Sequence, residues 1–243
     1  MGRMAEPTAI AARIEELLAD PVGSPTDSLA GRSFLVTAGG TREPLDSVRF
    51  VGNRSSGRMG VALATEAHRR GARVTMLAAN LAVPAPAGVD VVETPTAADL
   101  EREALARRDT DVVLMVAAVA DYRPANEIDG KRPKSDAGWT VELEPTTDVA
   151  RAFGEMKSKG QILVAFGAEE GLAGLERKRA MLADKNVDLV VYNDVSREDI
   201  GFDSGDNEVV LISKDGERLV PKASKASIAV AILDEVERLL APQ

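Results

Sequence analysis

Two clusters of small and hydroxyl residues have the composition of an anion-binding site. Gly39 and Gly40 follow an apolar run typical of a strand, and Ser55-Ser56-Gly57 precedes a stretch with helical spacing. Free N–H groups at a helix N-terminus point toward a bound ligand, and the positive end of the helix dipole favours negative charge. The serines could both cap the helix and donate hydroxyls to a phosphate. An ordinary serine cap with a closely packed glycine explains the motif equally well, so both alternatives stay open.

Two positive stretches within an acidic chain favour the anion alternative. The formal net charge is -9, yet residues 42–58 hold four arginines against two carboxylates, and residues 123–134 hold four basic residues against two acidic ones. The basic members are Arg42, Arg49, Arg54, Arg58, Arg123, Lys131, Arg132 and Lys134. We predict that these stretches form a positive entrance for a phosphate-bearing ligand. Spacing alone favours the alternative that Lys131 and Lys134 lie in a solvated turn.

The remaining composition excludes several function classes. The 243 residues include no cysteine and a single histidine, His68, which argues against disulfide scaffolds, zinc sites, thiol nucleophiles and most Ser–His–Asp arrangements. The negative charge argues against a nucleic-acid binder. The first residues lack the apolar run of a signal peptide, and no stretch reaches the ~18 apolar residues of a membrane helix. We therefore expect a cytoplasmic protein that binds neither nucleic acid nor membrane.

The elements that must position these clusters alternate between strand and helix. Six strands are predicted at residues 34–37, 73–77, 89–92, 111–116, 161–166 and 188–192. Helices are predicted near residues 57–70, 97–107, 148–157, 172–185 and 224–240, and a late antiparallel hairpin spans 208–213 with a turn at 214–217. Apolar strands separated by helices predict a Rossmann-like, doubly wound α/β fold with a mostly parallel sheet. In such a fold, ligands bind beyond the carboxyl ends of the strands, where both clusters would lie.

The N-terminal residues are predicted to form an appendage. Residues 7–19 have the spacing of an amphipathic helix, and residues 20–28 are rich in helix breakers. We expect two parts, a helix and linker over residues 1–32 and a catalytic domain over residues 33–243.

A nicotinamide-dependent oxidoreductase is the first alternative for this fold, and the motifs disfavour it. Gly39-Gly40 lacks the third glycine of the dinucleotide fingerprint, and the second strand ends in Ala78-Ala79-Asn80 without an acidic residue for the ribose. A Walker motif is also absent.

Four ordered motifs resemble phosphopantothenoylcysteine synthetase, the ligase of coenzyme A biosynthesis that often forms the C-terminal half of a bifunctional bacterial protein. They begin at Thr41, Asn53, Ala117 and Asn193, and read TREPLDSVRF, NRSSGRMG, AAVADY and NDV. The match runs from about residue 33 to the C-terminus. Residues 2–7 also resemble the end of the flavin-dependent decarboxylase half. The resemblance implies an excised or reduced bifunctional form, and with it association with a decarboxylase domain.

The resemblance implies a specific reaction. CTP, with Mg²⁺ carried by its triphosphate rather than by protein ligands, activates the carboxylate of 4′-phosphopantothenate as an acyl-cytidylate and releases pyrophosphate. The amine of cysteine then forms the amide and releases CMP. Such chemistry relies on positioning and charge more than on a general base. The family also implies a homodimer. A catalytically silent nucleotide-binding scaffold remains the alternative within the same fold.

Residue roles follow from the same resemblance. Asn53 matches the asparagine at the activated acyl group, Arg49 matches a second functional position, and Lys131 matches the lysine of a mobile flap. The expected nucleotide contacts are Gly39, Gly40, Ser55, Ser56, Gly57, Ala117, Ala118, Asp121, Lys131, Thr147, Asp148, Val149, Ala150, Phe166 and Lys185. The expected substrate contacts are Asn53, Arg42, Arg58 and Lys134. Without the family, packing would be the preferred explanation for Ala117, Ala118 and Phe166.

Two positions depart from the family pattern. Pro133 stiffens the middle of the flap sequence, and Met181 stands where a second lysine is common. Lys178 could replace that lysine.

Overall fold

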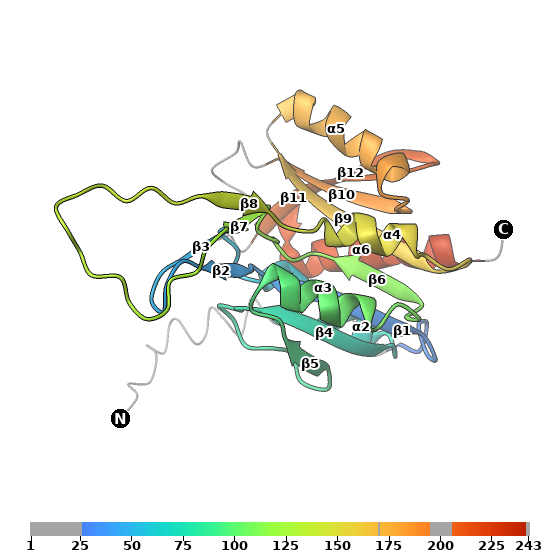
Figure 1. Cartoon of the computed structure of the whole chain (residues 1–243). Helices are drawn as coiled ribbons and strands as arrows, with labels where there is room; N and C mark the ends of the chain where they lie inside the picture. Colours follow the sequence, from blue (N-terminus) through green and yellow to red (C-terminus); the bar gives the residue numbers. More distant parts are fainter. Residues whose placement is uncertain (1–25, 170, 195–205, 242–243) are drawn as a thin grey trace, which may run out of the picture.

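An eight-stranded sheet forms the centre of the computed structural model, which describes residues 26–169, 171–194 and 206–241 (Figure 1). The strand order is β12-β11-β10-β9-β6-β1-β4-β5. The strands are β1 (Ser33–Gly39), β4 (Arg73–Ala79), β5 (Asp90–Glu93), β6 (Val112–Met115), β9 (Ile162–Glu169), β10 (Leu189–Asp194), β11 (Asp206–Ser213) and β12 (Gly216–Ser224). Neighbours from β10 to β5 run parallel, and β11 and β12 pair antiparallel. The predicted fold class, including its late hairpin, is confirmed.

Helices cover both faces of the sheet. Helices α2 (Arg58–Arg69) and α6 (Lys225–Leu240) pack on one face, and α3 (Ala97–Leu105), α4 (Val149–Glu155) and α5 (Gly171–Asp184) pack on the other. Side chains along β1 alternate between these two cores, with Phe34 and Val36 on the α2 side and Leu35 on the α3 side. This period of two explains why the strand is apolar throughout: both of its faces are buried.

The chain before β1 packs against the domain. Leu29 is 2% exposed within the core shared by α2 and α6, and its N–H donates to the carbonyl of Arg70 at 2.8 Å. Residues 26–32 thus contact the body of the fold, although the sequence assigned them to the junction. The predicted helix over residues 7–19 and most of its linker lie outside the described residues.

Two small antiparallel pairs stand outside the main sheet. The strands β2 (Arg42–Pro44) and β3 (Phe50–Gly52) form one pair, and β7 (Tyr122–Pro124) and β8 (Leu143–Pro145) form the other. The loop from 125 to 142, which joins β7 to β8, extends far from the sheet (Figure 1). The sequence did not predict these strands, because three residues are too few to show a periodicity. No helix in the described part of the chain is long and apolar enough to cross a membrane.

Candidate functional site

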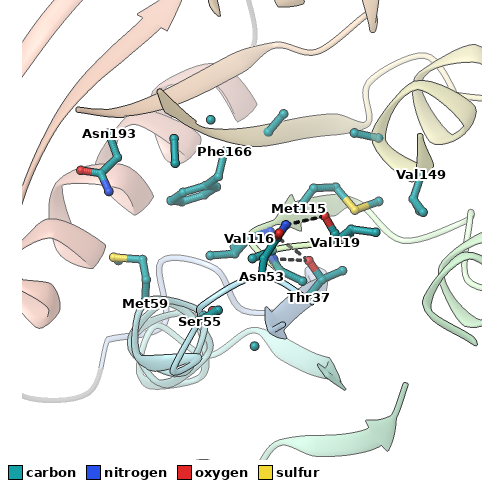
Figure 2. A pocket seen from close by; sticks show the side chains of 18 of the residues that line it. Thr37, Asn53, Ser55, Met59, Met115, Val116, Val119, Val149, Phe166 and Asn193 are labelled. Carbon is teal, nitrogen blue, oxygen red and sulfur yellow. Dashed lines mark hydrogen bonds between the residues drawn. The ribbon is translucent and has the colours of Figure 1, made fainter. Parts of the chain in front are cut away.

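A cavity of about 540 Å³ opens at the carboxyl ends of the parallel strands. Its walls come from the carboxyl-terminal parts of β1, β6, β9 and β10, from the loop that follows β6, and from the first turns of α2, α4 and α6 (Figure 2). The lining includes members of both cores, such as Met59 on the α2 side and Met181 on the α5 side. The cavity therefore reaches across the sheet edge from one face to the other, as the doubly wound fold predicts.

The start of α2 forms the anion-binding side of the cavity. Gly57 is the N-cap residue with φ 81°, no side chain hydrogen-bonds to the cap, and the first turn has no acidic residue. The expectation that Ser55 and Ser56 cap the helix is therefore corrected. A β-carbon on Gly57 would lie 2.4 Å from the Leu81 side chain, and one on Gly39 would lie 1.9 Å from the Ala79 carbonyl oxygen. Glycine is required at both positions for the first turn of α2 to approach the end of β1.

Two buried threonines shape the loop that follows β6. The N–H groups of Val116 and Ala117 both donate to Thr37 Oγ1 at 2.9 Å, and the N–H of Ala120 donates to Thr41 Oγ1 at 2.9 Å. The two threonine side chains are 1% and 0% exposed. Their hydroxyls replace the partners that these amides lose where the strand ends, so the loop has a defined path.

The amide of Asn53 reaches this loop from the other side. Its Nδ2 donates to the carbonyl oxygen of Val119 at 2.9 Å, and the side chain is exposed at the cavity wall (Figure 2). The amide keeps a second N–H and its oxygen for contact with a ligand in the cavity.

A charged pair lies on the α4 and α5 side. Lys185 Nζ is 2.9 Å from Asp148 Oδ2, and Asp148 caps α4 by accepting from the N–H of Arg151 at 3.0 Å. Burial by itself would raise the pKa of Asp148, but these two donors outweigh it and hold the pKa below its usual value. Lys185 is therefore positioned by an ionised carboxylate.

Most of the residues expected from the sequence line this cavity. They are Gly39, Asn53, Ser55, Ser56, Gly57, Arg58, Ala117, Ala118, Asp121, Thr147, Asp148, Val149, Ala150, Phe166 and Lys185. Lys178 and Met181 also line it, and the stem of Lys178 lies over Gly167 while its Nζ is 3.2 Å from Glu169 Oε1.

Five expected residues do not line the cavity. Gly40 is buried beside it, bridged to Ala118, and Arg42 stacks on the exposed ring of Phe50 at 4.7 Å. Lys131 and Lys134 are exposed on the loop between β7 and β8.

The fifth residue, Arg49, belongs to a cluster that ties the β2–β3 turn to this loop. Its guanidinium pairs with Asp46 at 2.7 Å and lies 5.6 Å from the ring of Trp139, which also stacks with Arg132 at 4.5 Å. Burial would raise the pKa of Asp46, but N–H donors from Val48, Arg49 and Arg132 and the charge of Arg49 hold it below its usual value. Arg49 and Arg132 of the predicted positive entrance thus make contacts within the chain, whereas Arg54 and Arg58 line the cavity.

Sequence reasoning missed several residues that line the cavity. Thr37, Asn207 and Lys225 come from the sheet and from the start of α6. None belongs to a motif with a recognisable spacing, and the only available signal was their place at the ends of elements near the carboxyl edge. Within the described residues, no group of three or more His, Cys, Asp or Glu side chains could hold a metal ion.

The fold agrees with comparisons to known proteins. A model of the family described as DNA/pantothenate metabolism flavoprotein C-terminal domain matches residues 29–240. The chain belongs to this family. The resemblance identified from the four motifs is thereby confirmed at the family level.

Relatives extend over the whole chain. The coenzyme A biosynthesis bifunctional protein CoaBC of Bacillus subtilis (strain 168) is 40% identical over 242 residues, covering 98% of this chain and 58% of that protein. The protein of the same name from Mycobacterium tuberculosis (strain ATCC 25618 / H37Rv) is 41% identical over 252 residues, covering 99% and 60%. The chain thus spans about three fifths of the length of the curated relatives it matches.

Solved structures share the fold. The crystal structure of the C-terminal domain of a CoaBC protein superposes with a TM-score of 0.75 at 35% identity, covering 88% of this chain and 98% of that one. The DNA/pantothenate metabolism flavoprotein from Streptococcus pneumoniae superposes with a TM-score of 0.74 at 23% identity, covering 86% and 99%.

Proposed function

We propose that this domain is a phosphopantothenate–cysteine ligase of coenzyme A biosynthesis. One observation carries the proposal: a single cavity brings together Asn53, the Ala117-Ala118 loop, Asp121 and residues 147–150, to which the resemblance assigns contacts with the acyl group and the nucleotide. The names of the relatives at 40% and 41% identity agree with this role.

The proposed first step is the activation of a carboxylate. A carboxylate oxygen of 4′-phosphopantothenate bonds to the α-phosphorus of CTP, the bond from that phosphorus to the α–β bridging oxygen breaks, and pyrophosphate leaves with the electron pair. The first turn of α2 would bind phosphate oxygens through its uncapped N–H groups. The nucleoside would be held by Asp121, by residues 147–150 at the start of α4, and by Phe166 and Lys185.

The proposed second step forms the amide. The amine of cysteine attacks the acyl carbon, CMP leaves with the electron pair of the acyl–oxygen bond, and the amine loses a proton. Asn53 would donate from its amide to the oxygen that becomes negative during attack. Its existing contact with the Val119 carbonyl orients the amide without adding a competing charge.

Magnesium would enter with the nucleotide. Asp121 and Asp148 are the carboxylates at the cavity wall, and no metal-binding group of three was found among the described residues. This donor set fits an ion that keeps most of its ligands from phosphate oxygens and water, where it would neutralise charge on the triphosphate.

The loop between β7 and β8 would complete the site. Lys131 lies outside the cavity, so its proposed role requires the loop to close over the bound nucleotide.

We also propose a homodimer through the β2–β3 and β7–β8 pairs, because Val48, Phe50, Tyr122 and Leu143 expose large apolar side chains there. Association with a decarboxylase domain and a cytoplasmic location complete the proposal; the relatives' name, bifunctional protein, agrees with the former.

A coupled assay for pyrophosphate tests the proposal. We expect release only when the protein, CTP, Mg²⁺ and phosphopantothenate are combined, and phosphopantothenoylcysteine should form once cysteine is added. Asn53→Ala should lower kcat by about 100-fold, the usual loss for one oxyanion donor, with an unchanged melting temperature. Nucleotide binding without pyrophosphate release from any nucleotide would instead identify the scaffold alternative.

A further inference from the structure

The cavity has a buried cation that none of the motifs contains. Lys225 lines the cavity, is 8% exposed, and is the first residue of α6. It has a further interaction within the protein, as a buried charge requires, so a ligand would be an additional partner. A lysine at this position adds its charge to the positive end of the helix, which costs stability unless an anion is nearby.

A second helix begins at the same cavity. The first turn of α2 lines it through Arg58, Met59 and Gly60, and α2 packs against α6 on one face of the sheet. Neither helix has an acidic residue in its first turn. Two helix N-termini and a buried ammonium therefore direct positive potential into one end of the cavity, within a domain whose net charge is -9.

Two asparagines at this end have unused polar atoms. Asn207 is 5% exposed and accepts from the N–H of Glu208 at 3.0 Å, while its Nδ2 has no hydrogen bond within the described residues. Asn193 Oδ1 is buried at the cavity with no partner in the described part of the chain (Figure 2). The Nδ2 of Asn207 can donate to a phosphate oxygen, whereas the Oδ1 of Asn193 can accept only from a donor group of a ligand, such as a hydroxyl.

We propose that Lys225 and Asn207, with the first turn of α2, form the subsite for the β- and γ-phosphates of the nucleotide. This inference rests on the proposed function and adds the group that receives the leaving pyrophosphate. When the bond from the α-phosphorus to its bridging oxygen breaks, negative charge grows on the pyrophosphate. A buried ammonium stabilises that charge more strongly than an exposed lysine, because solvent screens it less. Lys225 thus acts within the cavity, whereas Lys131 must reach it by a loop movement.

Calorimetric titrations of the whole chain test the subsite with three probes: inorganic pyrophosphate, CTP and CMP, each with Mg²⁺. Lys225→Met should weaken pyrophosphate and CTP binding by about tenfold or more, the effect of one charged hydrogen bond, and leave CMP binding within about twofold. Lys225→Arg should retain most of the affinity. Lys214→Met is the control, because it removes the same charge from the exposed turn between β11 and β12 and should change none of these affinities.

Other outcomes overturn the inference. Equal loss for CTP and CMP would mean that Lys225 only supports the cavity, and unchanged CTP binding would remove it from the site. A further titration uses phosphopantothenate. If Lys225→Met weakens the binding of phosphopantothenate but not that of CTP, the subsite holds the phosphate of the acid substrate and the assignment to the nucleotide is wrong. No pyrophosphate or CTP binding by the unmodified protein also overturns the inference.

A labelling measurement covers the case in which Lys225→Met does not fold. Magnesium pyrophosphate should protect Lys225, but not Lys214, from acetylation of the unmodified protein, as read by peptide mass spectrometry. Equal labelling of Lys225 with and without pyrophosphate contradicts the subsite. Protection of Lys225 in a protein that makes no product with CTP and phosphopantothenate would uphold the subsite and refute the proposed ligase activity.

Discussion

Thr37 belongs to none of the four motifs, but its hydrogen bonds position residues of the motif that begins at Ala117. Its hydroxyl oxygen accepts from the N–H groups of Val116 and Ala117, directly before the loop on which Ala118 and Asp121 depend for their position. Sequence patterns identified the loop because its residues are contiguous. They could not identify Thr37, because its partners are 79 and 80 positions away.

Replacing Thr37 with valine should therefore reduce activity through the loop. Thr37→Val keeps the shape but leaves two N–H groups without an acceptor, and we expect a loss of about 1–3 kcal/mol in the free energy of unfolding. The KM for at least one substrate should rise by about tenfold, because the cavity wall shifts. Thr37→Ser retains the oxygen and should remain close to the unmodified protein in both measurements. Equal kinetics for the two variants would refute the positioning role.

The main helices and strands followed from periodicity, and the irregular elements did not. Every predicted strand and helix of the main sheet appears, because each buries an apolar face that leaves a pattern in the sequence. The strands of the pairs β2–β3 and β7–β8 have three residues each, too few to show a periodicity, and β7 pairs with residues as far along the chain as Pro145. Arg49 was expected in the site from its motif, and its contact with Trp139, 90 positions later in the chain, leaves no signal in the sequence.

An ion-pair network between α2 and α6 should make the free energy of unfolding depend on pH. Glu66 is 4% exposed and pairs with Arg69 and Arg70, and Arg70 also pairs with Asp234 and Glu237 of α6. Burial would raise the pKa of Glu66, but the two arginines outweigh it and lower the pKa. Because this pKa is lowered, Glu66 contributes to the free energy of unfolding at pH values above its unfolded pKa of about 4.3. The contribution is lost as the pH falls through the pKa of Glu66 in the folded protein.

Glu66→Gln should thus lower the free energy of unfolding by about 2–4 kcal/mol at pH 7, and the difference should shrink as the pH falls below about 4. Urea denaturation between pH 7 and pH 3 measures this. Glu155→Gln, at an exposed position on α4, should show no such pH-dependent difference. A constant difference for Glu66→Gln across that range would contradict the account.

The loop between β7 and β8 contains a tryptophan whose fluorescence can report a movement of the loop. Trp139 is the chain's single tryptophan, is 37% exposed and contacts Arg49 and Arg132. If the loop closes to deliver Lys131, addition of CTP and phosphopantothenate should change the fluorescence of Trp139. Trp139→Phe should lose the signal while still binding CTP. Constant fluorescence under conditions where calorimetry shows binding of both substrates would contradict loop closure.

At the scale of the whole molecule, the fold concentrates positive potential in a negative protein. The net charge of -9 leaves the outer surface rich in carboxylates, while α2 and α6 direct their positive ends at one cavity. The absence of cysteine and the presence of one exposed histidine fit a reaction driven by positioning and charge. In the proposed reaction, the only sulfur that matters belongs to the substrate.

An isotope experiment tests the central claim, that CTP activates a carboxylate as an acyl-cytidylate. Phosphopantothenate labelled with ¹⁸O in its carboxylate is incubated with the protein, CTP, Mg²⁺ and cysteine, and the products are analysed by mass spectrometry. Because the carboxylate oxygen bonds to the α-phosphorus and leaves with CMP, we predict one ¹⁸O atom in each CMP formed. Label in inorganic phosphate or pyrophosphate, or no product with CTP, would contradict the account.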